Sequence, residues 1–278
     1  MTETPPRTGT GRDGPPAVEA VDLTRRYGDL VAVDGLSLTI PARIVFGLLG
    51  PNGAGKSTTV KMLTTLLEPT SGEARVAGWD VVREAHQVRR CIGYVPQLLS
   101  ADGLLTGYEN LLISAKLYGI PRKERGPRVE EALRHMGLWE AAHVLVRNYS
   151  GGMIRRLEIA QAMLHRPQVL FLDEPTVGLD PVARRAVWAH IRELRDRFGT
   201  TVVLTTHDME EADELCDLVA ILHQGRLAAL GTPEDLKARV GSGATLDDVF
   251  AHFTGGAITE GGTFRDVLRT RRTARRLG

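Results

Sequence analysis

Residues 50–57 read Gly50-Pro51-Asn52-Gly53-Ala54-Gly55-Lys56-Ser57, the most informative motif of the chain. It matches the phosphate-loop pattern, in which a glycine, four residues and a second glycine precede lysine and a hydroxyl residue. Glycine lets the backbone turn tightly and aim its N–H groups at phosphate oxygens. The alternative is a glycine-rich turn that arose by chance, but such a turn does not need a strand before it and a helix after it.

Both flanking elements are predicted. Arg43–Leu49 is an apolar run typical of a buried strand, and the helix is expected from about Ser57 to Leu67, before Pro69 and Gly72. The positive N-terminal end of that helix faces the same anion as the loop. Lys56 is therefore expected to reach the β and γ phosphates of a nucleotide, and Ser57 is expected to bind Mg²⁺.

The remaining pattern predicts an α/β fold with a parallel sheet, because strands and helices alternate. A helix is expected after Asp180, with Pro181 at its first position and Gly199 at its end. Between about residues 98 and 166 the pattern is mostly helical, which indicates an inserted helical subdomain. The other predicted strands are Ala17–Leu23, Val31–Val33, Leu36–Ile40, Val169–Leu172, Thr201–Leu204 and Leu218–Leu222, and the helical patterns are Glu109–Tyr118 and Val129–Met136.

A second acidic motif follows the apolar run at Val169–Leu172. Asp173 emerges at the carboxyl end of this predicted strand, where α/β sheets place their ligands. Asp173 therefore fits a second Mg²⁺ anchor, and Glu174 fits a general base for an attacking water. A solvated acidic turn is the alternative, and the phosphate loop in the same chain argues against it.

A third motif is Ser150-Gly151-Gly152, which precedes a helical pattern. Ser150 is a suitable helix N-cap, and this explains the serine without assigning it a function. Two successive glycines weaken a helix, so the cap alone does not explain them. A close approach of backbone to a phosphate does.

Composition sets broad limits. The chain has 278 residues and a net charge of +1, so its overall charge gives no reason to expect a nucleic-acid partner. Its two cysteines, Cys91 and Cys216, form no disulfide framework and suggest a reducing compartment. The longest apolar runs are far shorter than the roughly 18 residues of a membrane span. Residues 1–16 are expected to form a disordered leader, and residues 241–278 a C-terminal extension with an arginine-rich tail.

With these motifs in this order, the chain resembles the ATP-binding subunits of ATP-binding-cassette (ABC) transporters from about Val18 to Thr254. Gln97 matches the glutamine loop of that family, His207 the switch histidine, and Tyr27 the aromatic residue that stacks on adenine. Ser150-Gly151-Gly152-Met153 resembles the family signature, and Gly178-Leu179-Asp180-Pro181 resembles its aspartate loop. The resemblance implies a phosphate-loop NTPase core at residues 17–240, with an antiparallel β subdomain beside the parallel sheet and the helical insertion.

The resemblance also implies a mechanism. Two copies would dimerise head to tail around two ATP molecules, with Glu174, His207 and Gln97 as catalytic residues. Ser57, Gln97 and Asp173 would serve the Mg²⁺ ion. The residues expected to bind ATP are Tyr27, Gly50, Pro51, Asn52, Gly53, Ala54, Gly55, Lys56, Ser57, Thr58, Ser150, Gly151, Gly152 and Asp180. A separate transmembrane permease would be the partner, contacted through residues 98–108 at the cytoplasmic face of the membrane.

Tyr149 and Met153 depart from the usual leucine and glutamine of the signature. Together with Thr245–Phe250, the Ser-Gly-Gly-Met variant is similar to the drug- and antibiotic-resistance exporters of the family. The implied function is ATP-driven efflux of such a compound. A soluble cassette ATPase acting on the ribosome or DNA is the alternative, and a non-hydrolysing ATP sensor is a second one. Glu174 and His207 argue against the sensor.

Overall fold

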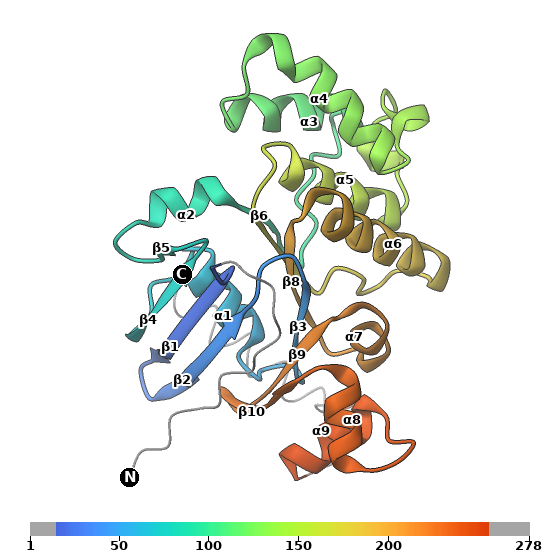
Figure 1. The fold of residues 1–278 in the computed structure, drawn as a ribbon. Coiled ribbons are helices and arrows are strands. Elements are labelled where there is room, and N and C mark those ends of the chain that lie inside the picture. The colour runs from blue at the N-terminus through green and yellow to red at the C-terminus, as the bar shows by residue number, and fades with distance from the viewer. Residues whose placement is uncertain (1–14, 256–278) are drawn as a thin grey trace.

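The structure is a computed structural model that describes residues 15–255, and Figure 1 shows its fold. The strands are β1 (Val18–Tyr27), β2 (Leu30–Ile40), β3 (Val45–Leu49), β4 (Ser71–Val76), β5 (Trp79–Asp80), β6 (Ile92–Val95), β7 (Val169–Asp173), β8 (Thr201–Thr206), β9 (Leu218–His223) and β10 (Arg226–Gly231). The α-helices are α1 (Lys56–Leu63), α2 (Ala85–Cys91), α3 (Gly107–Leu117), α4 (Arg122–His135), α5 (Gly151–Met163), α6 (Pro181–Phe198), α7 (Met209–Leu215), α8 (Pro233–Val240) and α9 (Leu246–Thr254). Two short 3₁₀ turns cover Trp139–Ala141 and Val146–Asn148.

A six-stranded sheet forms the centre of the fold, in the order β10-β9-β3-β8-β7-β6. Its strands are parallel except β10, which pairs antiparallel with β9. All residues of β3 and β7 are buried, as expected for parallel strands that are covered on both faces. The predicted parallel α/β sheet is therefore confirmed.

The side chains of the central strands alternate between two apolar cores. Leu170 and Leu172 of β7 belong to a core that the helices α3 to α6 share. Val169 and Phe171 belong to the other core, which lies between the central sheet and the N-terminal strands. Side chains along a strand point to opposite faces in turn, so one short strand anchors both cores.

The N-terminal strands form a second, antiparallel sheet in the order β2-β1-β4-β5. The helix α1 contacts β2 and β4 of this sheet and β7 of the central one. It therefore lies where the two sheets meet, which fixes the loop that precedes it. Figure 1 shows this sheet beside α1, with the helices α3 and α4 at the opposite end of the molecule.

The helices α3, α4 and α5 contact one another and lie within the range predicted to be a helical insertion. Thr106 begins α3 with a reciprocal capping box, in which its hydroxyl accepts from Glu109 N and the Glu109 carboxylate accepts from Thr106 N. The predicted caps of two other helices are also present. The Ser150 hydroxyl accepts from Met153 N at 3.3 Å, and the Asp180 carboxylate accepts from Val182 and Ala183 N at 2.9 Å. The domain limits given above remain predictions.

Several predicted elements have different bounds in the structure. Val31–Val33 and Leu36–Ile40 are one strand, β2, because Gly35 forms a bulge with a φ of 62° instead of ending the strand. The helix α1 ends at Leu63 and does not reach Leu67, since Thr65 adopts a left-handed φ of 64°. The helix α4 begins at Arg122, seven residues before the predicted Val129.

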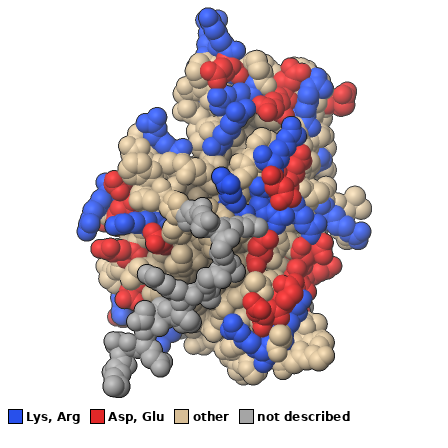
Figure 2. All heavy atoms as spheres, in the orientation of Figure 1, with Lys and Arg blue, Asp and Glu red and all other residues tan. Residues whose placement is uncertain are grey.

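Residues 1–14 of the expected leader and the arginine-rich part of the expected tail lie outside the described residues. Over residues 15–255, no helix is both long and apolar enough to cross a membrane. Both signs of charge occur over most of the face shown in Figure 2.

Candidate functional site

The phosphate loop joins β3 to α1 and needs glycine for close packing. A Cβ on Gly50 would lie 2.4 Å from the Leu222 carbonyl oxygen, and one on Gly55 would lie 2.5 Å from the Ala32 carbonyl oxygen. Gly55 also has a φ of 104°, a left-handed conformation that only glycine adopts without strain. No larger residue fits either position. The loop is thus held against β9 and β2, with the N-terminus of α1 directly behind it.

Lys56 is buried at the start of α1. Its ammonium donates to the carbonyl oxygens of Gly50 at 2.7 Å and Pro51 at 3.3 Å, and it lies 3.4 Å from Glu174 Oε1. Burial lowers the pKa of Lys56, and the negative charges of Glu174 and Asp173 partly offset this effect. The lysine is therefore fixed within the loop, and its charge is directed toward the two carboxylates at the end of β7.

Ser57 and Asp173 bring two oxygen ligands together. The Ser57 hydroxyl donates to Asp173 Oδ1 at 3.1 Å, and the Thr205 hydroxyl donates to the same oxygen at 2.6 Å. Thr205 is opposite Asp173 in the parallel pairing of β7 with β8. A hydroxyl and a carboxylate at this spacing are the hard oxygen donors that suit Mg²⁺.

Glu174 is the centre of the site. Its N–H donates to both oxygen atoms of Thr205, the carbonyl at 3.1 Å and the hydroxyl at 3.0 Å, and its φ is 49°. Gln97 Nε2 donates to Glu174 Oε2 at 3.0 Å, and His207 Nδ1 lies 3.2 Å from Glu174 Oε1. The three predicted catalytic side chains thus converge, although 77 and 33 residues of sequence separate Gln97 and His207 from Glu174.

The comparisons with known proteins agree with this geometry. A family model described as ABC transporter matches residues 33–177. The chain belongs to the ABC transporter family. It is 49% identical over 226 residues to the daunorubicin/doxorubicin resistance ATP-binding protein DrrA of Streptomyces peucetius, covering 81% of this chain and 68% of that protein. It is 40% identical over 224 residues to the linearmycin resistance ATP-binding protein LnrL of Bacillus subtilis, covering 81% and 72% respectively.

A solved structure of an ATP-binding subunit of an ABC transporter has the same fold. Its TM-score is 0.76 at 31% identity, covering 85% of this chain and 99% of that one. This ABC-family chain is therefore an ATP-binding protein and an ATPase. Its fold class and the recognition of its family from sequence are both confirmed.

Four of the residues expected to bind ATP make contacts with other parts of the protein. Tyr27 ends β1, where it is exposed and has the Arg25 guanidinium 4.7 Å from its ring centre. A Cβ on Gly152 would lie only 2.7 Å from the Ala183 side chain, so the signature packs against α6, the helix that Asp180 caps. The hydroxyl of Ser150 and the carboxylate of Asp180 both cap helices. Tyr27, Ser150, Gly151, Gly152 and Asp180 remain predicted ligands.

Thr205 is a site residue that sequence reasoning missed. It supports Asp173 and Glu174 together, which explains how two adjacent carboxylates keep separate directions. A signal for it was present: β8 ends in two threonines, Thr205 and Thr206, directly before His207. Parallel strands present their carboxyl ends at one edge, so a hydroxyl there is close to Asp173.

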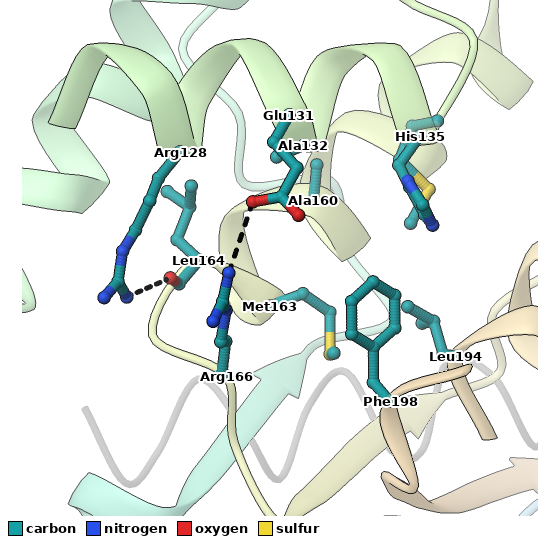
Figure 3. A pocket seen from close by; sticks show the side chains of 11 residues that line it. Arg128, Glu131, Ala132, His135, Ala160, Met163, Leu164, Arg166, Leu194 and Phe198 are labelled. Carbon is teal, nitrogen blue, oxygen red and sulfur yellow. Dashed lines mark hydrogen bonds and ion pairs between the residues drawn. The ribbon is translucent and has the colours of Figure 1, made fainter. Parts of the chain in front are cut away.

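A pocket elsewhere in the protein is not part of this site. Figure 3 shows its lining, which comes mainly from α4, α5 and α6 and excludes every residue assigned to nucleotide or Mg²⁺. Its residues are Arg128, Glu131, Ala132, His135, Met136, Ala160, Met163, Leu164, Arg166, Leu194 and Phe198. The polar rim is internally paired, with Arg166 3.4 Å from Glu131 and Arg128 bound to the Leu164 carbonyl.

Proposed function

We propose that this chain is the ATP-hydrolysing subunit of an exporter that removes a drug- or antibiotic-like compound through a separate membrane permease. The observation that carries this proposal is the 49% identity, over 226 residues, to a protein named for daunorubicin and doxorubicin resistance. The second relative, named for linearmycin resistance, supports the same class of cargo. The Thr245–Phe250 motif, which resembles the resistance exporters, is an ordered part of the fold. Its residues Val249 and Phe250 lie on α9 and pack into the core that α3 to α6 share.

In this proposal the phosphate loop holds the nucleotide. Backbone N–H groups within residues 50–58, where Pro51 alone has none to donate, and the ammonium of Lys56 bind the β and γ phosphates. Ser57, Asp173 and the amide oxygen of Gln97 would hold Mg²⁺, which would neutralise charge on the phosphate oxygens. The partly buried Ser57–Asp173 hydrogen bond of 3.1 Å supports this assignment, because it brings two of the three ligands together.

Glu174 acts as the general base for the attacking water. Its carboxylate is buried, and Lys56, Gln97 and His207 surround it. When the γ phosphate binds Lys56, the ammonium gains a partner of higher charge, and Glu174 Oε1 becomes available to accept a proton from water. Gln97 orients the carboxylate and the water, and His207 contacts the γ phosphate.

Two copies of the chain complete two such sites. Ser150, Gly151 and Gly152 of one copy contact the ATP held on the phosphate loop of the other, beside Asp180, and Tyr27 stacks on the adenine. A γ phosphate bridged by both copies favours the closed dimer, and hydrolysis removes that preference. The dense packing of the signature against α6 supports its role as a rigid surface for a partner.

The proposed location is the cytoplasmic face of the membrane, with the chain bound peripherally to its permease. Three exposed leucines in the segment that follows Gln97 support this contact: Leu98, Leu99 and Leu104. Exposed apolar side chains close together in sequence are typical of an interaction surface. The alternative, a soluble cassette ATPase on the ribosome or DNA, has no such support from the relatives named above.

Fractionation separates these two functions. The tagged protein is expressed in its native cell and sedimented with membranes, ribosomes and chromosomal DNA. We expect it in the membrane fraction, and Leu98→Ser with Leu99→Ser should release it without loss of ATP binding. Growth of a deletion strain in daunorubicin or linearmycin tests the cargo class. Ribosome-bound protein, absent from membranes, would contradict the proposal.

A further inference from the structure

The helix α5 carries a buried ion pair outside the nucleotide site. Arg155 Nη1 lies 3.0 Å from Glu158 Oε2, and the two side chains are only 4% and 2% exposed. Removing two charges from water costs free energy that their mutual attraction repays only partly. Stability alone therefore does not explain the pair. Its other hydrogen-bond partners indicate what it does.

Those partners are backbone groups of residues 96–101, the loop that follows β6. Arg155 donates to the Pro96 carbonyl at 2.8 Å and to the Gln97 carbonyl at 2.9 Å. Glu158 Oε1 accepts from the N–H of Ser100, from the Ser100 hydroxyl at 3.1 Å and from the N–H of Ala101 at 3.3 Å. Arginine thus holds the start of the loop and glutamate holds its end.

Apart from Ala101, which packs partly buried against the core that α3 to α6 share, this loop has few other anchors. Residues 96–101 form no helix or strand, so their backbone groups need partners from elsewhere. Leu98 and Leu99 are 83% and 54% exposed, so they do not anchor the loop in the core. The buried pair on α5 holds the loop in place, because charged groups make stronger hydrogen bonds than neutral ones.

The held loop carries Gln97, whose side chain reaches Glu174 at 3.0 Å while its carbonyl accepts from Arg155. A shift of the Gln97 backbone would therefore move its amide away from the carboxylate. Burial lowers the pKa of Arg155, and the charges of Glu158 and Asp173 offset only part of this lowering. The guanidinium remains charged at working pH, since arginine does not deprotonate in proteins.

We propose that Arg155 and Glu158 are positioning residues that hold the loop of residues 96–101 so that Gln97 stays on Glu174. The same pair ties this loop to α5, the helix that begins after Ser150, so a movement of α5 is transmitted to Gln97. This inference rests on the proposed role of Gln97 in hydrolysis.

The first test compares two neighbouring arginines on α5. Arg155→Met removes the contact with the loop, whereas Arg156→Met removes a bond of 2.7 Å to the Met136 carbonyl, at the end of α4. We expect Arg155→Met to lower kcat by about ten- to a hundredfold with little change in KM for ATP, because misplacement of a reacting group slows the chemical step. Arg156→Met should retain kcat, and Arg155→Lys should recover part of it.

Hydrogen exchange gives a second readout, independent of activity. The N–H groups of Ser100 and Ala101 should exchange faster in Glu158→Ala, while the amides of α4 keep their protection. Glu158→Gln, which retains an acceptor oxygen, should give intermediate exchange. Unchanged exchange at both amides in folded Glu158→Ala would overturn the proposal.

A double-mutant cycle with Gln97→Ala decides whether Arg155 acts through Gln97. If it does, Arg155→Met causes no further loss of kcat once Gln97 is alanine. Additive losses, or full activity of Arg155→Met alone, would overturn the positioning role. If Gln97→Ala alone keeps the wild-type kcat, Gln97 has no role in hydrolysis. That result would contradict both the proposed role of Gln97 and the inference that depends on it.

Discussion

Lys56 Nζ lies 3.4 Å from Glu174 Oε1, which joins the phosphate loop to the proposed base through a buried ion pair. Both residues have further partners, the Gly50 carbonyl for the lysine and Gln97 for the glutamate. The proposed phosphate-binding residue and the proposed base are therefore in direct contact with each other. In the proposed mechanism a bound phosphate would compete with Glu174 for Lys56, so nucleotide binding and release of the base would be coupled.

Lys56→Ala should weaken ATP binding by about ten- to a hundredfold, since hydrogen bonds to charged groups contribute about 1.5–3 kcal/mol. Titration with a fluorescent ATP analogue measures the affinity. Lys61→Ala is the matched control, because Lys61 lies on the same helix and is exposed. An affinity of Lys56→Ala equal to that of the control would remove Lys56 from phosphate binding.

Glu174→Gln should form a stable dimer in ATP, because the nucleotide that bridges the two copies is no longer consumed. Adding Ser150→Arg should keep this variant monomeric, since a bulky cation at the signature blocks the partner's nucleotide. Size-exclusion chromatography with light scattering measures the mass. A charge reversal at Arg185, an exposed residue of α6, serves as the control: Arg185→Glu in the Glu174→Gln background should still dimerise. A dimer that survives Ser150→Arg would contradict the head-to-tail arrangement.

The two cysteines should differ in reactivity. Burial raises the pKa of Cys216 well above its ordinary 9.0, and the charges of Glu211 and Asp217 add to this rise, whereas Cys91 is partly exposed. Because the thiolate is the reactive form, a disulfide reagent at pH 8 should modify only Cys91 in the folded protein. Cys91→Ser should give no reaction until denaturant is added. Rapid reaction of folded Cys91→Ser would show that Cys216 is accessible.

The same pKa shift gives a pH dependence. Above pH 9 the unfolded chain loses the Cys216 proton while the folded chain keeps it, so the folded state binds more protons. Stability then falls as pH rises, and this residue contributes to the slope. Urea titrations between pH 8 and pH 10 should show a shallower decline for Cys216→Ala than for the wild type. Equal pH slopes of stability for the two proteins would contradict a contribution from the raised pKa of Cys216.

The sequence predicted the parts of the site that depend on local pattern. The phosphate loop needs eight consecutive residues, and the paired carboxylates follow directly from the buried strand that ends at Asp173. The convergence of Gln97 and His207 on Glu174 depends on the strand order β8-β7-β6, which periodicity alone does not give. For those two residues, resemblance to a family carried the prediction.

The elements that were missed or misplaced have physical reasons too. Asp34-Gly35 has the composition of a turn, yet the strand continues through it as a bulge at Gly35, and Asp34 pairs with Arg226 of the neighbouring β10 at 2.6 Å. The strand β4 was not predicted, because it is short and its first three residues are exposed, so it lacks an apolar run. Arg155 and Glu158 resemble an ordinary charged pair on a helix surface until the loop that covers them is seen.

Mg²⁺-dependent ATP hydrolysis by the wild type and by Glu174→Gln, with native membranes present and absent, distinguishes an ATPase coupled to export from one that is not. We predict turnover that requires Mg²⁺, rises when membranes containing the permease are added, and is lost in Glu174→Gln although that variant still binds ATP. Glu174→Gln that hydrolyses ATP at the wild-type rate would contradict the assignment of the base. Wild-type turnover that membranes do not change would contradict the coupling to export.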